Sequence, residues 1–181
     1  VKLVNFFGHS ASTSWDFSIQ NPKDFNNYGK YPLINSFGCY SGNLHGINKG
    51  ISESFVLEKD KGSISFYAST GSAFVQDLSL YGYKFFRLQL NENKNKSLGT
   101  IIKDLASTYR DTLTQFKTLI SQLTFHGDPA LKLHIDEAPD YLFNQEVAKS
   151  IPATVQAAAQ TFEVELECRN IGSFKKDSVD M

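Results

Sequence analysis

The sequence has few of the residues that define specialised classes of protein. Among its 181 residues only two are cysteines, one is a tryptophan and one is a methionine. No apolar run approaches the roughly 20 residues that a membrane-spanning helix needs. The formal net charge of -1 gives no electrostatic reason to expect nucleic acid or an anionic membrane surface as a partner. With 41% hydrophobic and 20% charged residues, the composition fits a soluble globular protein with a core.

The two cysteines, Cys39 and Cys168, lie in very different contexts. A disulfide framework is therefore not expected. No phosphate-binding glycine loop, zinc knuckle or basic aromatic patch is present. The histidines other than His9 do not lie at metal-ligand spacing from cysteines or carboxylates, and we expect structural roles for His45, His126 and His134.

Strand-like and helix-like patterns alternate along most of the chain, which predicts a parallel sheet with crossover helices. Apolar runs over 1–7, 32–38 and 63–68 are typical of strands. Helical spacing or helix-ending signals predict helices over 51–58, 74–90 and 97–123, and 131–135 again resembles a strand. The first strand begins at Val1 with no basic leader, so we expect the chain to be cut from a longer one.

The character of the sequence changes after residue 136. We expect a polar linker over 137–150 and the first strands of a β-sandwich over 151–181. Residues 162–168 alternate apolar and polar side chains, the mark of a half-buried antiparallel strand. Cys168 is expected to pack inside that sandwich.

His9 and Cys39 each follow a predicted strand, and each has a glycine directly before it. Ligands of open α/β sheets gather outside the carboxyl ends of the strands. A thiol attacks a carbonyl usefully as the thiolate, and a neighbouring imidazole takes its proton and later delivers it to the leaving amine. The pair therefore predicts a cysteine hydrolase, with Cys39 as nucleophile and His9 as general base. Taken singly, each residue more often has a structural role.

The surrounding residues predict the rest of the site. The backbone N–H groups of Ser10 and Cys39 are candidates for an oxyanion hole. Trp15 either walls a substrate pocket or pins a long loop to the core. Residues 69–71 either line the pocket for the residue before the scissile bond or only form a turn. The predicted pocket comprises Gly8, Trp15, Gly38, Tyr40, Ser69, Thr70 and Gly71.

Three aspartates, Asp16, Asp24 and Asp77, are possible specificity carboxylates for a basic substrate side chain. Solvated loop charge is the more common role for each of them. Asp128 directly before Pro129 is typical of a turn.

The residues around His9 and Cys39 resemble the two active-site motifs of gingipain-type cysteine peptidases. The motifs are Asn-Phe-Phe-Gly-His-Ser over 5–10, followed by Trp15, and Asn-Ser-Phe-Gly-Cys-Tyr-Ser-Gly-Asn over 35–43. Further blocks match in order over 51–57, 62–71 and 127–134. The resemblance covers about residues 1–136 and extends to the clan of caspases, legumains and clostripain.

This resemblance implies a caspase-like open α/β sheet with helices on both faces, followed by an immunoglobulin-like domain. It implies hydrolysis of protein or peptide substrates through a Cys39 thioester, with no cofactor required for the chemistry and calcium binding only by family analogy. The alternatives are a surface transpeptidase or sorting-signal peptidase of a type IX secretion system, and a catalytically inactive structural surface module. Family members are typically exported by Bacteroidetes to the cell surface or medium.

The chain departs from the family pattern in two ways. The family usually has glycine directly after the histidine, where this chain has Ser10, and a side chain there would narrow the oxyanion region. The family also has further strands before the histidine strand, and the sequence here does not include them. In some relatives those strands supply an acidic residue that orients the histidine.

Overall fold

The computed structural model describes residues 2–17, 21–92, 95–109, 114–133, 138–139, 141–158, 160–170 and 172. The chain divides into two compact units, Val1–His134 and Ile135–Met181. Each unit has its own β-sheet. Among the described residues, no helix is long and apolar enough to cross a bilayer.

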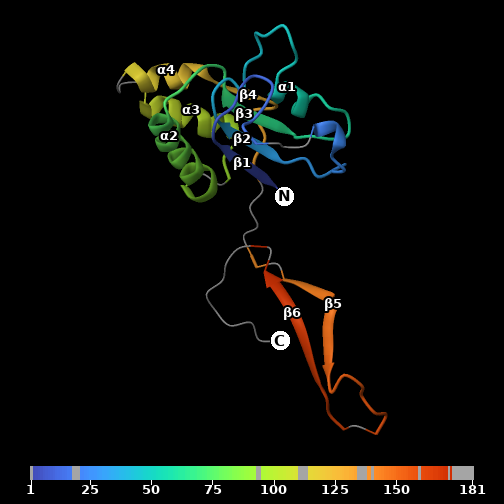
Figure 1. Cartoon of the computed structure of the whole chain (residues 1–181). Coiled ribbons are helices and arrows are strands. Elements are labelled where there is room, and N and C mark those ends of the chain that lie inside the picture. Colours follow the sequence, from blue (N-terminus) through green and yellow to red (C-terminus); the bar gives the residue numbers. More distant parts are fainter. Residues whose placement is uncertain are drawn as a thin grey trace. The chain divides into compact units, whose positions relative to one another are not determined.

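The first unit contains a mostly parallel sheet of order β1-β2-β3-β4 (Figure 1). Its strands are β1 (Leu3–Phe7), β2 (Leu33–Phe37), β3 (Ser65–Ser69) and β4 (Leu123–His126). Strands β1, β2 and β3 pair in parallel, and β4 runs antiparallel to β3. Every residue of β2 and β3 is buried, as expected when helices cover both faces of a parallel sheet.

Helices lie on both faces of this sheet, so the predicted mostly parallel α/β arrangement is confirmed (Figure 1). The helices are η1 (Pro22–Asp24), α1 (Ile51–Val56), α2 (Val75–Arg87), the π-helical η2 (Leu88–Glu92), α3 (Leu98–Tyr109) and α4 (Thr114–Gln122). Helices α2, α3 and α4 share one core with the sheet, in which the buried hydroxyls of Tyr67 and Tyr81 lie 2.6 Å apart. Helix α1 closes the other core through Phe55, which packs near Trp15 and Phe66.

The single helix expected over 97–123 was wrong. Two helices, α3 and α4, occupy this stretch, and residues 110–113 between them lie outside the described residues. The apolar side chains continue at helical spacing because both helices cover the same face of the sheet. Periodicity alone therefore could not separate them.

The sequence also missed β4 and placed a strand too late. Residues 131–133 form no strand, and residues 134 and 135 lie outside the described residues. The segment instead satisfies backbone donors at the start of α3: the Leu98 N–H donates to the Leu131 carbonyl at 2.8 Å and the Gly99 N–H to the Pro129 carbonyl at 2.9 Å. First-turn N–H groups have no partner inside their own helix, so this segment supplies the acceptors that the start of α3 needs.

The second unit contains a two-stranded antiparallel sheet of β5 (Tyr141–Ile151) and β6 (Glu163–Asn170). The predicted strand over 162–168 is present, but every residue of β6 is exposed rather than half-buried, and Cys168 is exposed as well. Strand β5 occupies most of the range that was expected to be a linker. Its residues pair with β6 across the sheet, with a register irregularity between Asn144 and Lys149.

Candidate active site

The pairing of β1 with β2 places His9 and Cys39 at the same level of the sheet. The parallel register runs in step to Phe7 opposite Phe37, and His9 and Cys39 each lie two residues beyond that pair. Neighbouring strands are about 4.8 Å apart, so the two residues leave adjacent strand ends at the carboxyl edge of the sheet. This is the edge at which open α/β sheets bind ligands.

The two side chains differ in their exposure. His9 is exposed to solvent, whereas Cys39 is half-buried. The Cys39 sulfur lies 3.9 Å from the carbonyl oxygen of Ala73, at the limit for a hydrogen bond to sulfur. The thiol is therefore neither sealed in the core nor fully solvated, and it lies beside the segment that follows β3.

A tight turn follows His9. The Asp16 N–H donates to the His9 carbonyl at 2.9 Å, and the Ala11 N–H donates to the Ser14 carbonyl at 2.8 Å. These bonds flank an antiparallel bridge between Ser10 and Trp15. The bridge is formed by the His9 carbonyl and the Ala11 N–H, so the Ser10 N–H takes no part in the hydrogen bonds of this turn.

Trp15 lies in the core beneath this turn. Its ring is only 7% exposed and stacks on Phe6 with ring centroids 4.7 Å apart. The indole N–H donates to the Ser36 hydroxyl at 2.8 Å, and that hydroxyl lies 2.8 Å from the hydroxyl of Ser41. Trp15 thus pins the loop after His9 to β2 and to the turn after Cys39, which agrees with the loop-anchoring interpretation of this residue.

Residues 69–71, at the end of β3, use their polar groups on neighbouring backbone. The Ser69 hydroxyl donates to the Gly71 carbonyl at 3.0 Å, and the Thr70 hydroxyl donates to the Gln122 carbonyl at 3.0 Å. The Gly42 N–H donates to the Ser69 carbonyl at 2.8 Å, which joins this turn to the one after Cys39. The observed side-chain bonds are therefore those of a turn that fixes the strand end.

A cavity of about 140 Å³ begins directly after this turn. It is lined by Ser72, Ala73, Phe74, Asp77, Gln115, Thr118, Leu119 and Gln122. Ala73, whose carbonyl lies beside the Cys39 sulfur, connects the cavity to the candidate nucleophile. Asp77 is 7% exposed, and the Gln115 side-chain amide lies 3.4 Å from its carboxylate.

The three candidate carboxylates thus have different surroundings. Asp77 is buried in the first turn of α2 and lines the same cavity as Ala73, whereas Asp16 and Asp24 are exposed. The sequence did not identify the cavity residues of α4, such as Gln115 and Thr118, because α4 reaches this place only through the tertiary fold. Asp77, in contrast, was one of the candidate carboxylates. Its place near the site follows from the sequence, because the crossover helix after β3 must begin at the carboxyl edge of the sheet.

Of the remaining histidines, His134 lies outside the described residues. His45 is exposed in the loop after Cys39, and His126 is partly buried on β4. In the described part of the chain, no group of three or more His, Cys, Asp or Glu side chains could hold a metal ion. We therefore assign no ligands for calcium.

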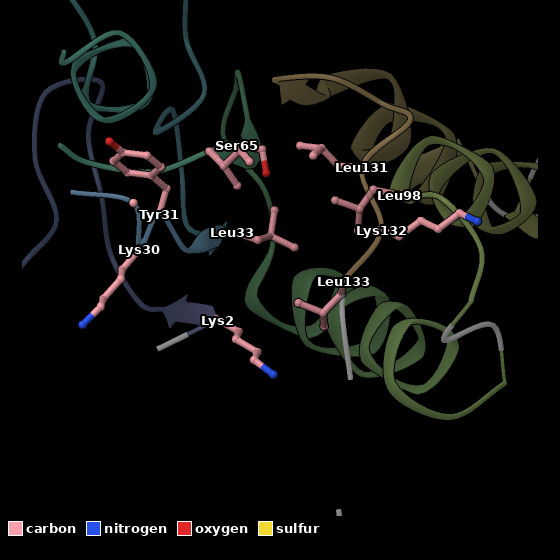
Figure 2. Close-up of a pocket in the computed structure, with 11 residues that line it drawn as sticks. Lys2, Lys30, Tyr31, Leu33, Ser65, Leu98, Leu131, Lys132 and Leu133 are labelled. Carbon is pink, nitrogen blue, oxygen red and sulfur yellow. The ribbon is translucent and has the colours of Figure 1, made fainter. Parts of the chain in front are cut away.

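A second cavity, of about 370 Å³, opens at the other end of the same sheet (Figure 2). Leucines 33, 98, 131 and 133 line it, with Lys2, Lys30 and Lys132 around them. Ser65, at the amino end of β3, contributes a buried hydroxyl with no partner among the described residues. The length of β3 separates Ser65 from the strand end at Ser69, about 13 Å at about 3.3 Å per residue.

A comparison with family models identifies the family of this chain. The model of peptidase family C25 matches residues 1–134, which is most of the chain. The chain belongs to peptidase family C25. This is the gingipain family, so the resemblance that the sequence suggested is confirmed. A comparison with curated proteins finds no match.

Solved structures share the fold of this C25 chain at low identity. The crystal structure of the Arg-specific cysteine proteinase gingipain R is 20% identical with a TM-score of 0.64, over 92% of this chain and 40% of that one. The complex of the Porphyromonas gingivalis RgpB pro- and mature domains is 20% identical with a TM-score of 0.66, over 92% and 41%. A structure described only as a protease is 14% identical with a TM-score of 0.65, over 83% and 41%. The chain therefore spans about 40% of the length of these structures.

Proposed function

We propose that this C25 chain carries the nucleophile and general base of a cysteine endopeptidase. The observation that supports the proposal best is the in-step register of β1 and β2, which brings His9 and Cys39 to adjacent strand ends. The exposed imidazole and the half-buried thiol both remain accessible to a substrate.

The proposed reaction proceeds through a thioester. His9 takes the Cys39 proton, and the sulfur bonds to the carbonyl carbon of the scissile peptide. The backbone N–H groups of Ser10 and Cys39 stabilise the oxyanion. The C–N bond then breaks as His9 returns the proton to the leaving amine. In the second half, water gives a proton to His9 and attacks the thioester, and the C–S bond breaks. The Cys39 sulfur takes that proton back from His9, so the carboxylic acid leaves and the free enzyme forms.

Alkylation with iodoacetamide tests the pairing, because the chain contains its own reference thiol. Cys168 is exposed and Cys39 is only half-buried, so accessibility alone would make Cys168 the faster. At pH 6 an ordinary thiol, with a pKa of about 8.5, is only about 0.3% thiolate. In the intact protein we expect Cys39 to react about tenfold faster than Cys168 at this pH.

The control variants separate pairing from other causes. His9→Ala should remove the advantage of Cys39 and leave the Cys168 rate unchanged, whereas His45→Ala should change neither rate. Equal rates at Cys39 and Cys168 in the unmodified protein would favour the inactive structural module instead. Product analysis with and without an added amine then separates hydrolysis from transpeptidation, because a transpeptidase passes the acyl group to the amine.

For substrate specificity we propose that Asp77 binds a basic side chain before the scissile bond. Asp77 is buried, lines a cavity that includes Ala73, whose carbonyl contacts the Cys39 sulfur, and forms no ion pair among the residues that the structure describes. A buried carboxylate without a cation is complementary to lysine or arginine. One structure with the same fold is named as an Arg-specific proteinase.

Matched substrates test this assignment. Removing one partner of a buried charge pair costs about 2–5 kcal/mol, so Asp77→Asn should lower kcat/KM for substrates with Arg or Lys at that position by about 30-fold or more. Substrates with an uncharged side chain there should be little affected. The exposed Asp24 provides the control, and Asp24→Asn should leave kcat/KM for both kinds of substrate unchanged. An equal loss for basic and uncharged substrates would contradict the assignment.

The family resemblance also suggests a fold for the second unit and a cellular location for the protein. We propose that β5 and β6 belong to an immunoglobulin-like sandwich, since both are antiparallel and β6 carries alternating apolar residues. Slow amide exchange along β6 in the intact protein would support this, and fast exchange would contradict it. Export to the surface or medium through a type IX system is tested by fractionating cells of a Bacteroidetes host with and without that system.

A further inference from the structure

The hydroxyl of Ser10 joins the two strand ends of the site. Its oxygen donates a hydrogen bond of 2.7 Å to the carbonyl oxygen of Cys39, 29 residues further along the chain. Ser10 directly follows the proposed base, and the acceptor belongs to the proposed nucleophile. A glycine at position 10, the usual residue of the family motif, could not make this bond.

The peptide group that follows Cys39 is consequently held on both sides. Its carbonyl accepts the bond from Ser10 in the loop after β1, and its N–H, which belongs to Tyr40, donates to the Gly71 carbonyl at 3.1 Å in the turn after β3. Segments from the two neighbouring strands therefore fix the plane of this one peptide. A fixed plane there limits rotation about the Cα–C bond of Cys39 itself.

The backbone beyond this peptide is strained. Tyr40 has a φ of 59°, the left-handed region that residues with a side chain rarely adopt. Such a conformation costs about 1–3 kcal/mol and persists only when surrounding contacts determine it. The hydrogen bonds from Ser10 and to Gly71 are contacts of this kind.

Gly38 provides the space that the Ser10 hydroxyl occupies. A Cβ at position 38 would lie 2.2 Å from the Ser10 oxygen and 2.8 Å from the Gly8 carbonyl oxygen. The two residues are therefore coupled: the serine hydroxyl fits because position 38 has no side chain.

We infer that Ser10 is a positioning residue, which acts through its hydrogen bond to the Cys39 carbonyl to hold the sulfur and the N–H of Cys39 in their reactive orientation. This inference rests on the proposed peptidase function. The hydroxyl contacts backbone rather than substrate, so its loss changes the rate of the chemical step and leaves substrate binding intact.

The test uses Ser10→Ala, which removes the hydrogen bond, and Ser10→Thr, which keeps the hydroxyl. A hydrogen bond of this kind contributes about 0.5–1.5 kcal/mol, so kcat and the alkylation rate of Cys39 should fall by about threefold to tenfold in Ser10→Ala. KM and the Cys168 rate should stay within about twofold, and Ser10→Thr should recover most of the loss.

Ser65→Ala is the matched control, because it removes a buried serine hydroxyl that has no partner among the described residues, at the far end of the sheet. It should leave kcat and the Cys39 rate unchanged. The inference is overturned if Ser10→Ala keeps the kcat of the unmodified protein, if KM rises in proportion, or if Ser10→Thr is as impaired as Ser10→Ala. Failure of the proposed function has a different signature: the unmodified protein would lack peptidase activity and His9→Ala would leave Cys39 alkylation unchanged.

Discussion

The two ends of the parallel sheet in the first unit are built differently. At the carboxyl end, hydrogen bonds link the turns after β1, β2 and β3, from Ser10 to Cys39, from Tyr40 to Gly71 and from Gly42 to Ser69. At the amino end, leucines surround a cavity of about 370 Å³ and the Ser65 hydroxyl has no partner among the described residues (Figure 2).

Under the proposed function, this difference follows from the different roles of the two ends. Strained backbone and close packing persist only where many contacts determine one geometry, and a reactive pair needs such a geometry. An apolar cavity imposes no comparable constraint on the strand ends beside it. Substitutions at the two ends should therefore have unequal effects, even when the chemical change is the same.

The largest effect is expected from Trp15→Ala at the carboxyl end. Removing a buried aromatic ring that packs on Phe6 and Phe66 should lower the free energy of unfolding by about 3–5 kcal/mol. Denaturant unfolding of the intact protein measures this loss. Tyr28→Ala is the control, because Tyr28 is 74% exposed and its loss should cost under about 0.5 kcal/mol. A similar loss of unfolding free energy in Trp15→Ala and Tyr28→Ala would contradict the expected role of Trp15 in the core.

A pair of glycine substitutions compares the two ends directly. Gly38→Ala forces a Cβ against the Ser10 hydroxyl and should cost about 1–3 kcal/mol of unfolding free energy while slowing alkylation of Cys39. Gly29 lines the amino-end cavity with a φ of 69° and no atom within 4 Å of an added Cβ. Gly29→Ala should cost only about 1–2 kcal/mol of backbone strain and leave the alkylation rate unchanged. An equal loss of alkylation rate in both variants would contradict the proposed asymmetry.

The smallest effect is expected from the titration of His126 on β4. Burial lowers the pKa of this imidazole below its usual 6.5, and the nearby Glu53 carboxylate opposes that change only in part. Because the folded state favours the neutral ring, the unfolded state takes up the proton first. The free energy of unfolding should fall as the pH drops below about 6.5 and level off below the lowered pKa.

Unfolding measured against pH in His126→Phe tests this assignment. The substitution removes the titrating group, so that part of the pH dependence should disappear. His45→Asn, in an exposed loop, should keep it. A profile that is unchanged in His126→Phe would show that another group is responsible.

The sequence predicted those parts of the fold that depend on local pattern. The strands at β1, β2 and β3 and helix α2 are present close to their expected places, because burial on both faces gives continuous apolar runs and amphipathic helices give helical spacing. Strand β4 was missed because it pairs with β3, which is distant in the sequence, for example Tyr67 with Phe125. A strand of only four residues is too short to show a pattern of its own. The exposure of β6 could not be predicted either, since alternation describes a strand with one face covered and does not identify the cover.

The candidate site divides in the same way. Glycines beside His9 and Cys39 pointed to the two strand ends, and parallel pairing brought those ends together. The bond from the Ser10 hydroxyl to the Cys39 carbonyl, and the approach of α4 to Asp77, join residues far apart in the chain. Neither contact has a local signature, so only the folded chain reveals them.

The burial of the one tryptophan in this sequence gives the site a built-in optical reporter. Indole emission shifts to longer wavelength when the ring is exposed to water. The Trp15 indole N–H donates a hydrogen bond to the Ser36 hydroxyl, which in turn contacts the Ser41 hydroxyl in the turn after Cys39. Any ligand that loosens or tightens the loops of His9 and Cys39 should therefore change the emission of Trp15, without a label and without turnover.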